Sequence, residues 1–438
     1  MDRTIGTLIK IAVPIVIGVV VILILNSITS ASCLNDFEGC LVDGGMDTDL
    51  AGLIAISLGV VLVATFPLLV TILLIWIERK FAARIQDRIG PNRVGPIGLV
   101  QPLADVVKLL GKEDITPAGA DKWLYNASPV MMVMSVLLIW AVMPLTPYHY
   151  GIDLEIGILY FIAVASIGTL AVIMAGWSSN NKYALLGAFR VVAQLISYEV
   201  PLALALLVPV MLAGSMSMVG IVEAQAGMWF LFSAPIAAFL FFISSQAETG
   251  RAPFDLLEAE SELVAGYNIE YSGMKFAMFF AGEFMHVFTN GVLMAVIFTG
   301  GWYGPFAREA PLLAFTYLML KSGFWYLLSL LMRNALPRVR IDQLMTFNWK
   351  FLVPLSIANL LMTAFLLKLV QEGGLAPSPE EASDFIANIP QTVVLFLGNV
   401  ALAAFVMTLI RNQGREERLA EDAGEPSDLT VTPAPAGD

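Results

Sequence analysis

Long apolar segments constrain this chain more than any other feature of its sequence. Of its 438 residues, 58% are hydrophobic and only 14% are charged. A run of roughly 18 or more apolar residues is long enough to cross a bilayer as a helix, and soluble proteins carry far more charge. The sequence therefore predicts an all-α, polytopic transmembrane helix bundle. About ten spans are expected, near residues 7–29, 52–76, 128–146, 157–177, 194–213, 228–246, 275–299, 311–332, 351–370 and 391–410.

Basic residues are confined to alternate loops between these spans. They fall in the loops 77–127, 178–193, 247–274 and 333–350, whereas the other loops hold only Arg308. The positive-inside rule places basic loops in the cytoplasm. We therefore expect these four loops and both termini to be cytoplasmic, in a bacterial inner membrane. There is no basic patch, so no nucleic-acid partner is expected.

One loop between two apolar segments carries many charged residues, although membrane proteins usually have few charges at such places. The stretch AETGRAPFDLLEAESELVAGYNIEYSGM, residues 247–274, lies between two apolar segments. Acids at membrane depth are costly and therefore indicate a functional site, with proton handling as the first candidate. The alternative is a solvated acidic loop. The charged residues are Glu248, Arg251, Asp255, Glu258, Glu260, Glu262 and Glu270.

Helical spacing groups some of these acids. On a helix that follows Pro253, Asp255, Glu258 and Glu262 would share one face, while Glu260 would point elsewhere. Close carboxylates in a poorly hydrated site cannot all be ionised, so at least one should bind a proton near neutral pH.

Two further acids, Glu199 and Glu283, lie within or beside predicted spans. They are either part of the same path or buried hydrogen-bonding groups between helices.

The loop 77–127 contains the second informative stretch. Its segment GPNRVGP alternates Gly and Pro and predicts a rigid turn. After Pro102, apolar side chains from Leu103 to Leu110 share one face of a predicted amphipathic helix that extends to Lys112, and Asp105 lies on another face. Such a helix lies in the membrane interface. It is either a surface anchor only, or part of the mouth of a cavity.

Several cofactor classes are excluded by residue counts. Two histidines, His149 and His286, fall at different depths and cannot form a pair of haem ligands, and two cysteines, Cys33 and Cys40, cannot hold an iron–sulfur cluster. Neither nucleotide-binding glycine motif is present. No metal site is predicted, and a redox cofactor must belong to another chain or arrive as a diffusing substrate. The two cysteines share an outer loop, as a disulfide or as free thiols.

Four segments together carry a resemblance to a known family. They are ERKFAARIQDRIGPNRVGPIGLVQPLADVVKLLGKED, GWSSNNKYALLGAFRVVAQLISYEV, AETGRAPFDLLEAESELVAGYNIEYSGMKFAMFF and LPRVRIDQLM. In order and spacing they resemble the H-subunit family of bacterial proton-pumping NADH:quinone oxidoreductase, whose mitochondrial counterpart is NADH dehydrogenase subunit 1 of respiratory complex I. The resemblance covers residues 52–370 and implies a core of eight spans, with one extra span at each end.

The resemblance implies roles for individual residues. The protein would form the entrance and chamber for quinone and couple quinone reduction to proton translocation, as part of an H⁺-translocating NADH:quinone oxidoreductase. The chamber residues implied are Arg79, Arg84, Arg88, Asp105, Arg251, Phe254 and Asp255. The proton path implied consists of Glu199, Glu248, Glu258, Glu260, Glu262, Glu270 and Glu283.

The resemblance also implies partners and a division of the chain. Quinone, with ubiquinone as the first expectation, would be the substrate, while FMN and iron–sulfur clusters would belong to partner subunits. Those partners are the peripheral quinone-site and terminal-cluster subunits, the neighbouring small membrane subunits, the antiporter-like subunits and lipid. The predicted regions are an N-terminal span with an acidic outer loop (1–51), the core (52–370), a C-terminal span (371–410) and a disordered cytoplasmic tail (411–438).

Two other functions remain open from the sequence. The chain could be the homologous subunit of a membrane-bound hydrogenase or of another complex with a donor other than NADH. It could also be a stand-alone ion transporter that uses the acid cluster.

Overall fold

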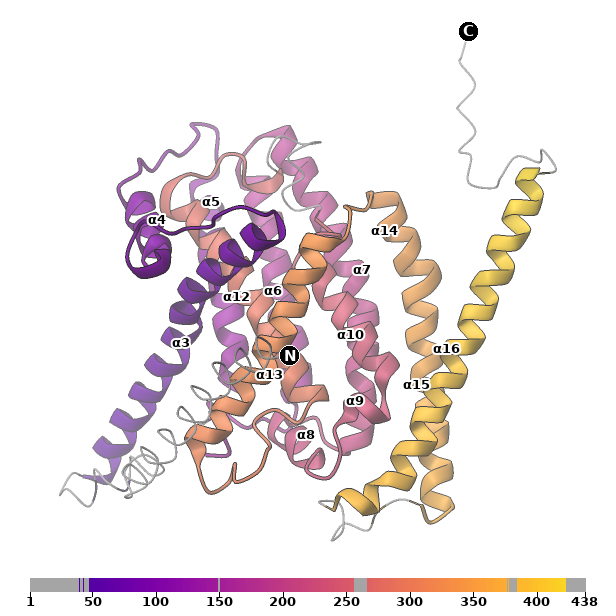
Figure 1. Cartoon of the computed structure of the whole chain (residues 1–438). Helices are drawn as coiled ribbons and strands as arrows, with labels where there is room; N and C mark the ends of the chain where they lie inside the picture. The colour runs from indigo at the N-terminus through magenta and orange to yellow at the C-terminus, as the bar shows by residue number, and fades with distance from the viewer. Residues whose placement is uncertain are drawn as a thin grey trace, which may run out of the picture.

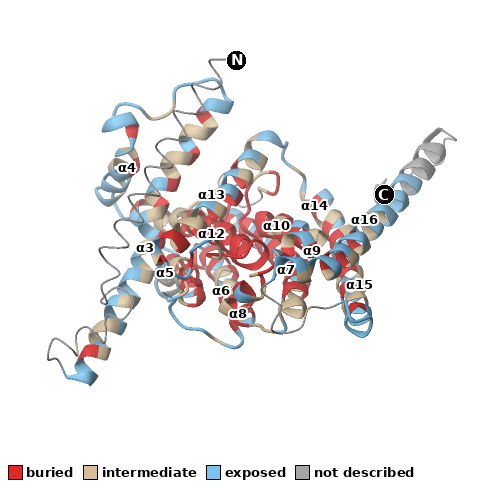
Figure 2. Ribbon diagram, turned by 60° about the horizontal axis from the view of Figure 1, so that its bottom comes forward, coloured by how far each residue is buried: buried red, intermediate tan, exposed pale blue. Residues whose placement is uncertain are grey.

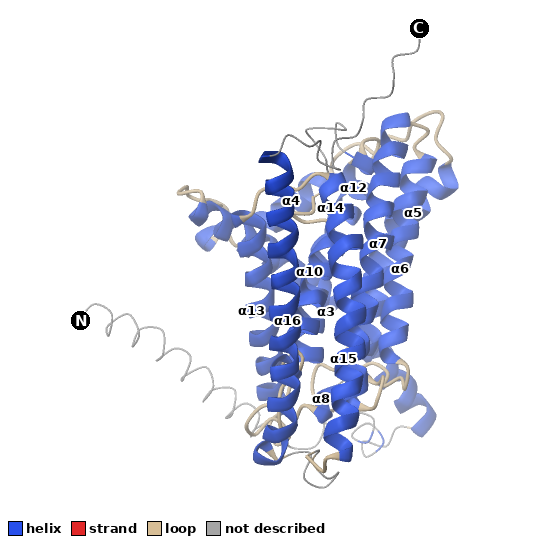
Figure 3. Ribbon diagram, turned by 90° about the vertical axis from the view of Figure 1, so that its right-hand side faces the viewer, coloured by secondary structure: helices blue, strands red, loops and turns tan. Residues whose placement is uncertain are grey.

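The computed structural model describes residues 47–148, 150–255, 266–375 and 384–422, together with residues 39, 42 and 377, and side chains in the last helix up to residue 412. Throughout this part of the chain the regular structure is helical, apart from one isolated bridge between Pro144 and Tyr150 (Figure 3). The predicted all-α bundle is therefore confirmed.

The helices form an upright bundle (Figure 1). They are α3 (Thr48–Ile85), α4 (Gln101–Leu110), α5 (Lys122–Ile139), α6 (Gly157–Ser178), α7 (Lys182–Ala213), α8 (Met218–Ala224), α9 (Phe230–Ser233), α10 (Pro235–Glu248), α12 (Gly273–Phe298), α13 (Pro311–Ala335), α14 (Ile341–Phe347), α15 (Val353–Glu372) and α16 (Phe385–Asp422), with short turns η1 (Pro96–Gly98), η2 (Trp140–Val142), η3 (Gly266–Asn268) and η4 (Asn348–Leu352).

Eight of these helical segments are long and apolar enough to cross a membrane. They coincide with eight of the ten predicted spans, so the chain is an integral membrane protein. The predicted span 7–29 lies outside the described residues. The remaining prediction, a single span at 228–246, differs from the structure, which divides this segment into α9 and α10.

The division of that segment has a local cause. Ala234 adopts a non-helical conformation (φ −139°, ψ 61°), and Pro235 follows at the first position of α10. Proline has no N–H to donate and restricts the residue before it. The chain therefore ends one helix and starts another within the bundle.

Helix α12 lies at the centre of the bundle and α16 at its edge. In α12, 83% of the most apolar stretch is buried, whereas in α16 only 11% is buried. Figure 2 shows buried residues concentrated around α10 and α12, and exposed residues along α16. In the core, the indole of Trp140 donates a hydrogen bond to Thr289 of α12 at 2.9 Å. The buried centre thus contains polar as well as apolar contacts.

The predicted amphipathic helix is present as α4 and ends at Leu110, two residues before the expected Lys112, where Gly111 follows. It lies beside the C-terminal end of α3, away from the bundle centre (Figure 1). Leu103, Val107 and Leu110 are each more than half exposed. An exposed apolar face with charged residues beside it suits the membrane interface.

Candidate functional site

A buried ionic cluster joins three segments near the C-terminal end of α3. The Glu78 carboxylate accepts a hydrogen bond from Arg251 Nη1 at 2.7 Å and another from the hydroxyl of Tyr326 at 3.4 Å. It also forms an ion pair with Arg333, in the last turn of α13. These contacts connect residues that are far apart in the sequence, and they hold α3, α13 and the loop after α10 together.

Arg251 is the most enclosed charge of this cluster, with a side chain only 1% exposed. Its Nε lies 3.6 Å from Glu283 Oε1, and its guanidinium stacks 4.6 Å from the ring centre of Phe284. Burial opposes the charged form, but the carboxylates of Glu78 and Glu283 raise the pKa of Arg251 above its usual value. The cluster is therefore a network of opposite charges inside the protein.

The loop that carries Arg251 is shaped by a glycine turn and by hydrogen bonds to backbone carbonyls at its two sides. Gly250 has φ +61°, a conformation that glycine adopts readily, and it turns the chain after α10. The side chain of Gln194 on α7 donates to the carbonyls of Ala247 (2.6 Å) and Phe254 (2.9 Å). Phe254 is buried, whereas Asp255 is partly exposed. Of these two predicted chamber residues, only Phe254 is part of the packed interior.

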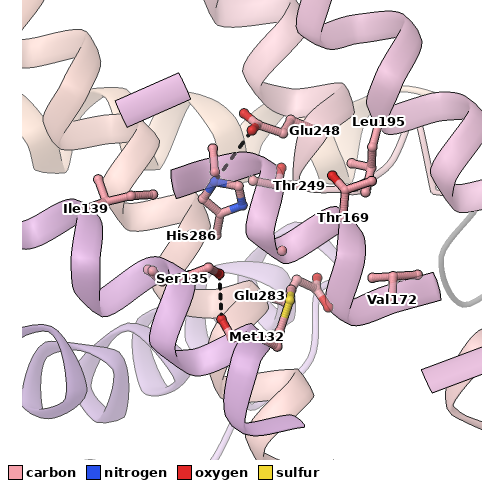
Figure 4. Close-up of a pocket in the computed structure, with 13 residues that line it drawn as sticks. Met132, Ser135, Ile139, Thr169, Val172, Leu195, Glu248, Thr249, Glu283 and His286 are labelled. Carbon is pink, nitrogen blue, oxygen red and sulfur yellow. Dashed lines mark hydrogen bonds and ion pairs between the residues drawn. The ribbon is translucent and has the colours of Figure 1, made fainter. Parts of the chain in front are cut away.

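A small cavity lies beside this cluster, between α5, α6, α7, α10 and α12 (Figure 4). Its volume is about 30 Å³, which is enough to hold water. Glu248, Glu283 and His286 line it, together with Thr169 of α6 and apolar side chains. Two of the predicted proton-path acids thus face one cavity from different helices.

The polar groups of the cavity lie close to one another. Nε2 of His286 lies 3.8 Å from Oε1 of Glu248, and the imidazole points toward that carboxylate (Figure 4). Glu199 of α7 lies beside Thr169, with 3.5 Å between its Oε1 and the threonine hydroxyl. The structure therefore places Glu248 and Glu283 on one cavity, with Glu199 beside its lining residue Thr169.

Glu283 belongs to both features. Its carboxylate faces Arg251 in the ionic cluster, and it lines the cavity that contains Glu248. A change of charge in the cluster therefore acts directly on a group of the cavity.

Glu270 lies apart from this cavity. Its carboxylate accepts a hydrogen bond from Asn181 Nδ2 at 2.7 Å, and its backbone carbonyl accepts one from the Tyr125 hydroxyl at 2.7 Å. It lines a surface hollow with Asn181 and Lys182 at the N-terminal end of α7. The structure thus separates Glu270 from the other described acids of the predicted path.

The remaining predicted chamber residues lie on α3, in the turn after it, and on α4. Arg79 pairs with Asp105 of α4, with 2.5 Å between Nη1 and Oδ2. Although partial burial opposes it, the hydrogen bond and charge of Arg79 hold the pKa of Asp105 below its ordinary value. Arg84 and Arg88 are exposed. The Arg79–Asp105 pair beside the interfacial helix is separate from the buried cluster.

Some predicted residues lie outside the described part of the chain. These are Glu258, Glu260 and Glu262, together with Cys33, Cys40 and His149. Where the structure describes the chain, no group of three or more His, Cys, Asp or Glu residues is placed to hold a metal ion.

Sequence reasoning did not select three residues that the structure places at this site. Glu78, Arg333 and His286 were not predicted, although each carried a weak signal. Glu78 ends a long apolar run, Arg333 ends the apolar part of α13, and His286 lies three residues after Glu283 on one helix face.

Comparison with known proteins agrees with the predicted resemblance. The family model of NADH dehydrogenase matches residues 58–364. The NADH-quinone oxidoreductase H-subunit 1 of Geobacter metallireducens is 48% identical over 305 residues, which cover 68% of this chain and 91% of that protein. The NADH-quinone oxidoreductase H-subunit of Dehalococcoides mccartyi strain CBDB1 is 46% identical over 308 residues, 68% of this chain and 83% of that protein. The chain therefore belongs to the NADH dehydrogenase family, in its H-subunit branch.

Proposed function

We propose that this chain is the membrane subunit of a proton-translocating NADH:quinone oxidoreductase that admits quinone and couples its reduction to proton transfer. It would act only in the assembled complex, in a bacterial inner membrane. FMN and iron–sulfur chemistry would take place on partner subunits, with quinone, first of all ubiquinone, as the substrate. The names of the relatives support the NADH and quinone parts of this proposal.

The observation that carries the proposal is the cavity shared by Glu248, Glu283 and His286, next to the buried Arg251. Acids inside a membrane bundle are costly and are retained for function. Groups that can accept a proton, in a space that can hold water, are what a proton path requires. The structural alternative, a buried hydrogen bond between helices, does not require a cavity.

The geometry supports a direct link between quinone chemistry and this path. In our proposal quinone enters near Arg79, Arg84, Arg88 and Asp105 and reaches the region of Arg251, Phe254 and Asp255. Reduction there changes local charge and takes up protons. Glu283 faces Arg251, so it responds to that change and alters the proton affinity of the cavity.

The acids outside this cavity would extend the path. We place Glu258, Glu260, Glu262 and Glu270 on the cytoplasmic side, where protons would enter or where charge would respond to quinone. Glu199 and Glu248 would continue the path toward the neighbouring small membrane subunits and the antiporter-like subunits. The core would be residues 52–370, with an additional region on either side.

The experiment replaces Glu248 by Gln in the assembled complex, with Glu223→Gln as a matched control. Glu223 is an exposed acid on α8 whose side chain is 56% exposed. Glu248→Gln should lower quinone reduction and proton translocation together, while NADH oxidation with a hydrophilic artificial acceptor stays at the wild-type rate. Glu223→Gln should retain all three activities.

The same substitution at Glu260 and Glu262 extends this test to the acidic loop. Wild-type quinone reduction and pumping in all three assembled variants would refute the proton path. If the purified chain alone conducted protons, with no co-purifying partners, the stand-alone transporter would be the better function. Co-purification with hydrogenase subunits would favour the hydrogenase-type complex.

The proposed orientation has its own test. A membrane-impermeant thiol reagent should label Cys33 or Cys40 in intact cells after mild reduction, because we place their loop outside. Labelling only in inverted vesicles would contradict this orientation.

A further inference from the structure

Helix α16 begins at residue 385, beyond the family match, which ends at residue 364. It lies along α15 at the edge of the bundle (Figure 1) and also contacts α9 and α10. Most of its side chains are exposed, but Thr392, Leu395 and Asn399 are 8%, 0% and 1% exposed. Positions i, i+3 and i+7 share one helix face. That face docks on the bundle.

The docking face meets the break between α9 and α10. At a broken helix, backbone N–H and C=O groups lose their partners within the helix, and lipid offers none in exchange. Here the side chain of Asn399 supplies the missing hydrogen-bond partners. Its Oδ1 accepts a hydrogen bond from the N–H of Ile236 at 3.4 Å, and its Nδ2 donates to the carbonyl of Ser233 at 3.3 Å.

A second contact fixes the same position. The hydroxyl oxygens of Ser233 and Thr392 lie 3.3 Å apart. Nδ2 of Asn399 also donates to the Leu395 carbonyl of its own helix at 2.9 Å, which orients the amide. Two polar side chains on one buried face of an otherwise exposed apolar helix thus reach the two sides of one break.

The opposite end of α10 is fastened by other helices. Gln194 of α7 donates to the Ala247 carbonyl, Ser329 of α13 donates to Gln246, and Asn290 of α12 donates to the Ser245 carbonyl at 3.3 Å. Glu248 is the last residue of α10. Because α10 is one continuous helix of 14 residues, about 21 Å long, the position of its outer end also affects where Glu248 lies.

We propose that α16 is a built-in clamp on the α9–α10 break, and that Asn399 is a positioning residue for α10 and its Glu248. A chain without this helix would need polar groups from a helix of another protein at the same surface. The docking stands on the contacts alone, whereas the effect on turnover rests on the proposed function.

Docking is tested by a disulfide between α9 and α16. Cys33 and Cys40 are first replaced by Ser, and a protease site is placed between residues 375 and 384. Ser233→Cys is then combined with Thr392→Cys in the full complex. After oxidation of membranes and cleavage, the part before the protease site and the part that contains α16 should stay joined until a reductant is added. Ser233→Cys with Val400→Cys is the control pair, because Val400 is 47% exposed. Parts that separate in the first pair, or join equally in both, would overturn the docking.

Positioning is tested with Asn399→Leu, and with Val400→Leu as the matched control on the exposed face. Asn399→Leu should lower quinone-linked turnover about threefold to tenfold, the factor associated with the net loss of hydrogen bonding at the break, with KM for quinone unchanged. Amide hydrogen exchange at residues 236–238 should become faster. Wild-type turnover and exchange in Asn399→Leu would overturn the positioning role.

A double variant separates positioning from general damage. In a Glu248→Gln background, Asn399→Leu should add little further loss, because both changes act through Glu248. Fully additive losses would overturn the positioning role. If Glu248→Gln alone runs at the wild-type rate, the place of Glu248 in the proton path and this positioning role both fail, while the disulfide still decides the docking.

Discussion

Glu78 and Arg79 are neighbours in the sequence but belong to two different regions of the molecule. The side chain of Glu78 is 10% exposed and faces Arg251, Arg333 and Tyr326 inside the bundle. The side chain of Arg79 is 45% exposed and pairs with Asp105 of the interfacial helix α4. Both regions are held by opposite charges, yet one is buried and the other is open to solvent.

This difference predicts different consequences of mutation. Removal of one member of a buried ion pair leaves an uncompensated charge and costs about 3–5 kcal/mol. An exposed pair contributes about 0–1 kcal/mol and is screened by salt. In the proposed function, the inner region takes part in coupling and the outer region in quinone access.

The largest effect is expected for Arg251→Ala. It leaves Glu283 and part of Glu78 without their buried counter-charge, so quinone-linked turnover should fall by at least about tenfold. NADH oxidation with a hydrophilic artificial acceptor should remain at the wild-type rate. Arg308→Ala, at an arginine whose side chain is 62% exposed, is the control. Equal loss of both activities in Arg251→Ala would indicate failed assembly and contradict the assignment.

An intermediate effect is expected for Tyr326→Phe. It removes the hydroxyl that donates to Glu78 and leaves both arginines in place. The lost hydrogen bond should cost about 1 kcal/mol, which corresponds to about a fivefold lower quinone-linked rate at saturating quinone. A loss as large as that of Arg251→Ala would mean that the hydroxyl, and not the ion pairs, dominates the cluster.

A smaller effect of a different kind is expected for Arg79→Ala. Loss of the exposed pair should raise KM for quinone by up to about fivefold, corresponding to about 1 kcal/mol, with turnover at saturating quinone unchanged. Because Arg79 lowers the pKa of Asp105, the pair is present above the ordinary aspartate range and is lost only as pH falls through that lowered pKa. The difference between wild type and variant should therefore be the same at pH 6 and pH 8. Loss of turnover without a change in KM for quinone would mean that the outer pair also takes part in coupling, so that the two regions would not differ in function.

The smallest effect is expected for Glu372→Gln on α15. Glu372 pairs with Lys368 one turn away, and its side chain is 64% exposed. Such a pair contributes no more than about 0.5 kcal/mol, so activity, pumping and thermal stability of the complex should match wild type. A measurable coupling defect in Glu372→Gln would show that the assays respond to any change of charge. The assays could then not distinguish the buried region from the exposed one.

Much of the helix pattern was predictable because hydrophobic length and periodicity are local properties. The eight long apolar helices and the amphipathic α4 follow from them. The break at Ala234 was missed, since hydropathy continues across it. Pro235 was the available signal, but proline also occurs inside intact spans here, as Pro201 does in α7. Hydropathy alone cannot distinguish these two cases.

The partners in the site were not predictable, because they are set by packing. Glu78 and Arg251 are separated by 173 positions, and no local pattern joins them. Glu248 was selected from the acidic loop, and Glu199 and Glu283 as acids within or beside spans. That Glu248 and Glu283 line one cavity, with Glu199 beside its lining residue Thr169, depends on how α6, α7, α10 and α12 pack. Glu270 was grouped with them by sequence and lies elsewhere for the same reason.

The most direct test compares Glu283→Gln with Asp105→Asn in proteoliposomes that contain the whole complex, measuring proton translocation and quinone reduction together. Glu283 is shared by the buried cluster and the cavity, whereas Asp105 belongs to the outer pair. We predict that Glu283→Gln lowers turnover at saturating quinone and pumping in parallel, with KM for quinone retained. Asp105→Asn should retain both turnover at saturating quinone and pumping. Wild-type pumping in assembled Glu283→Gln would contradict the account.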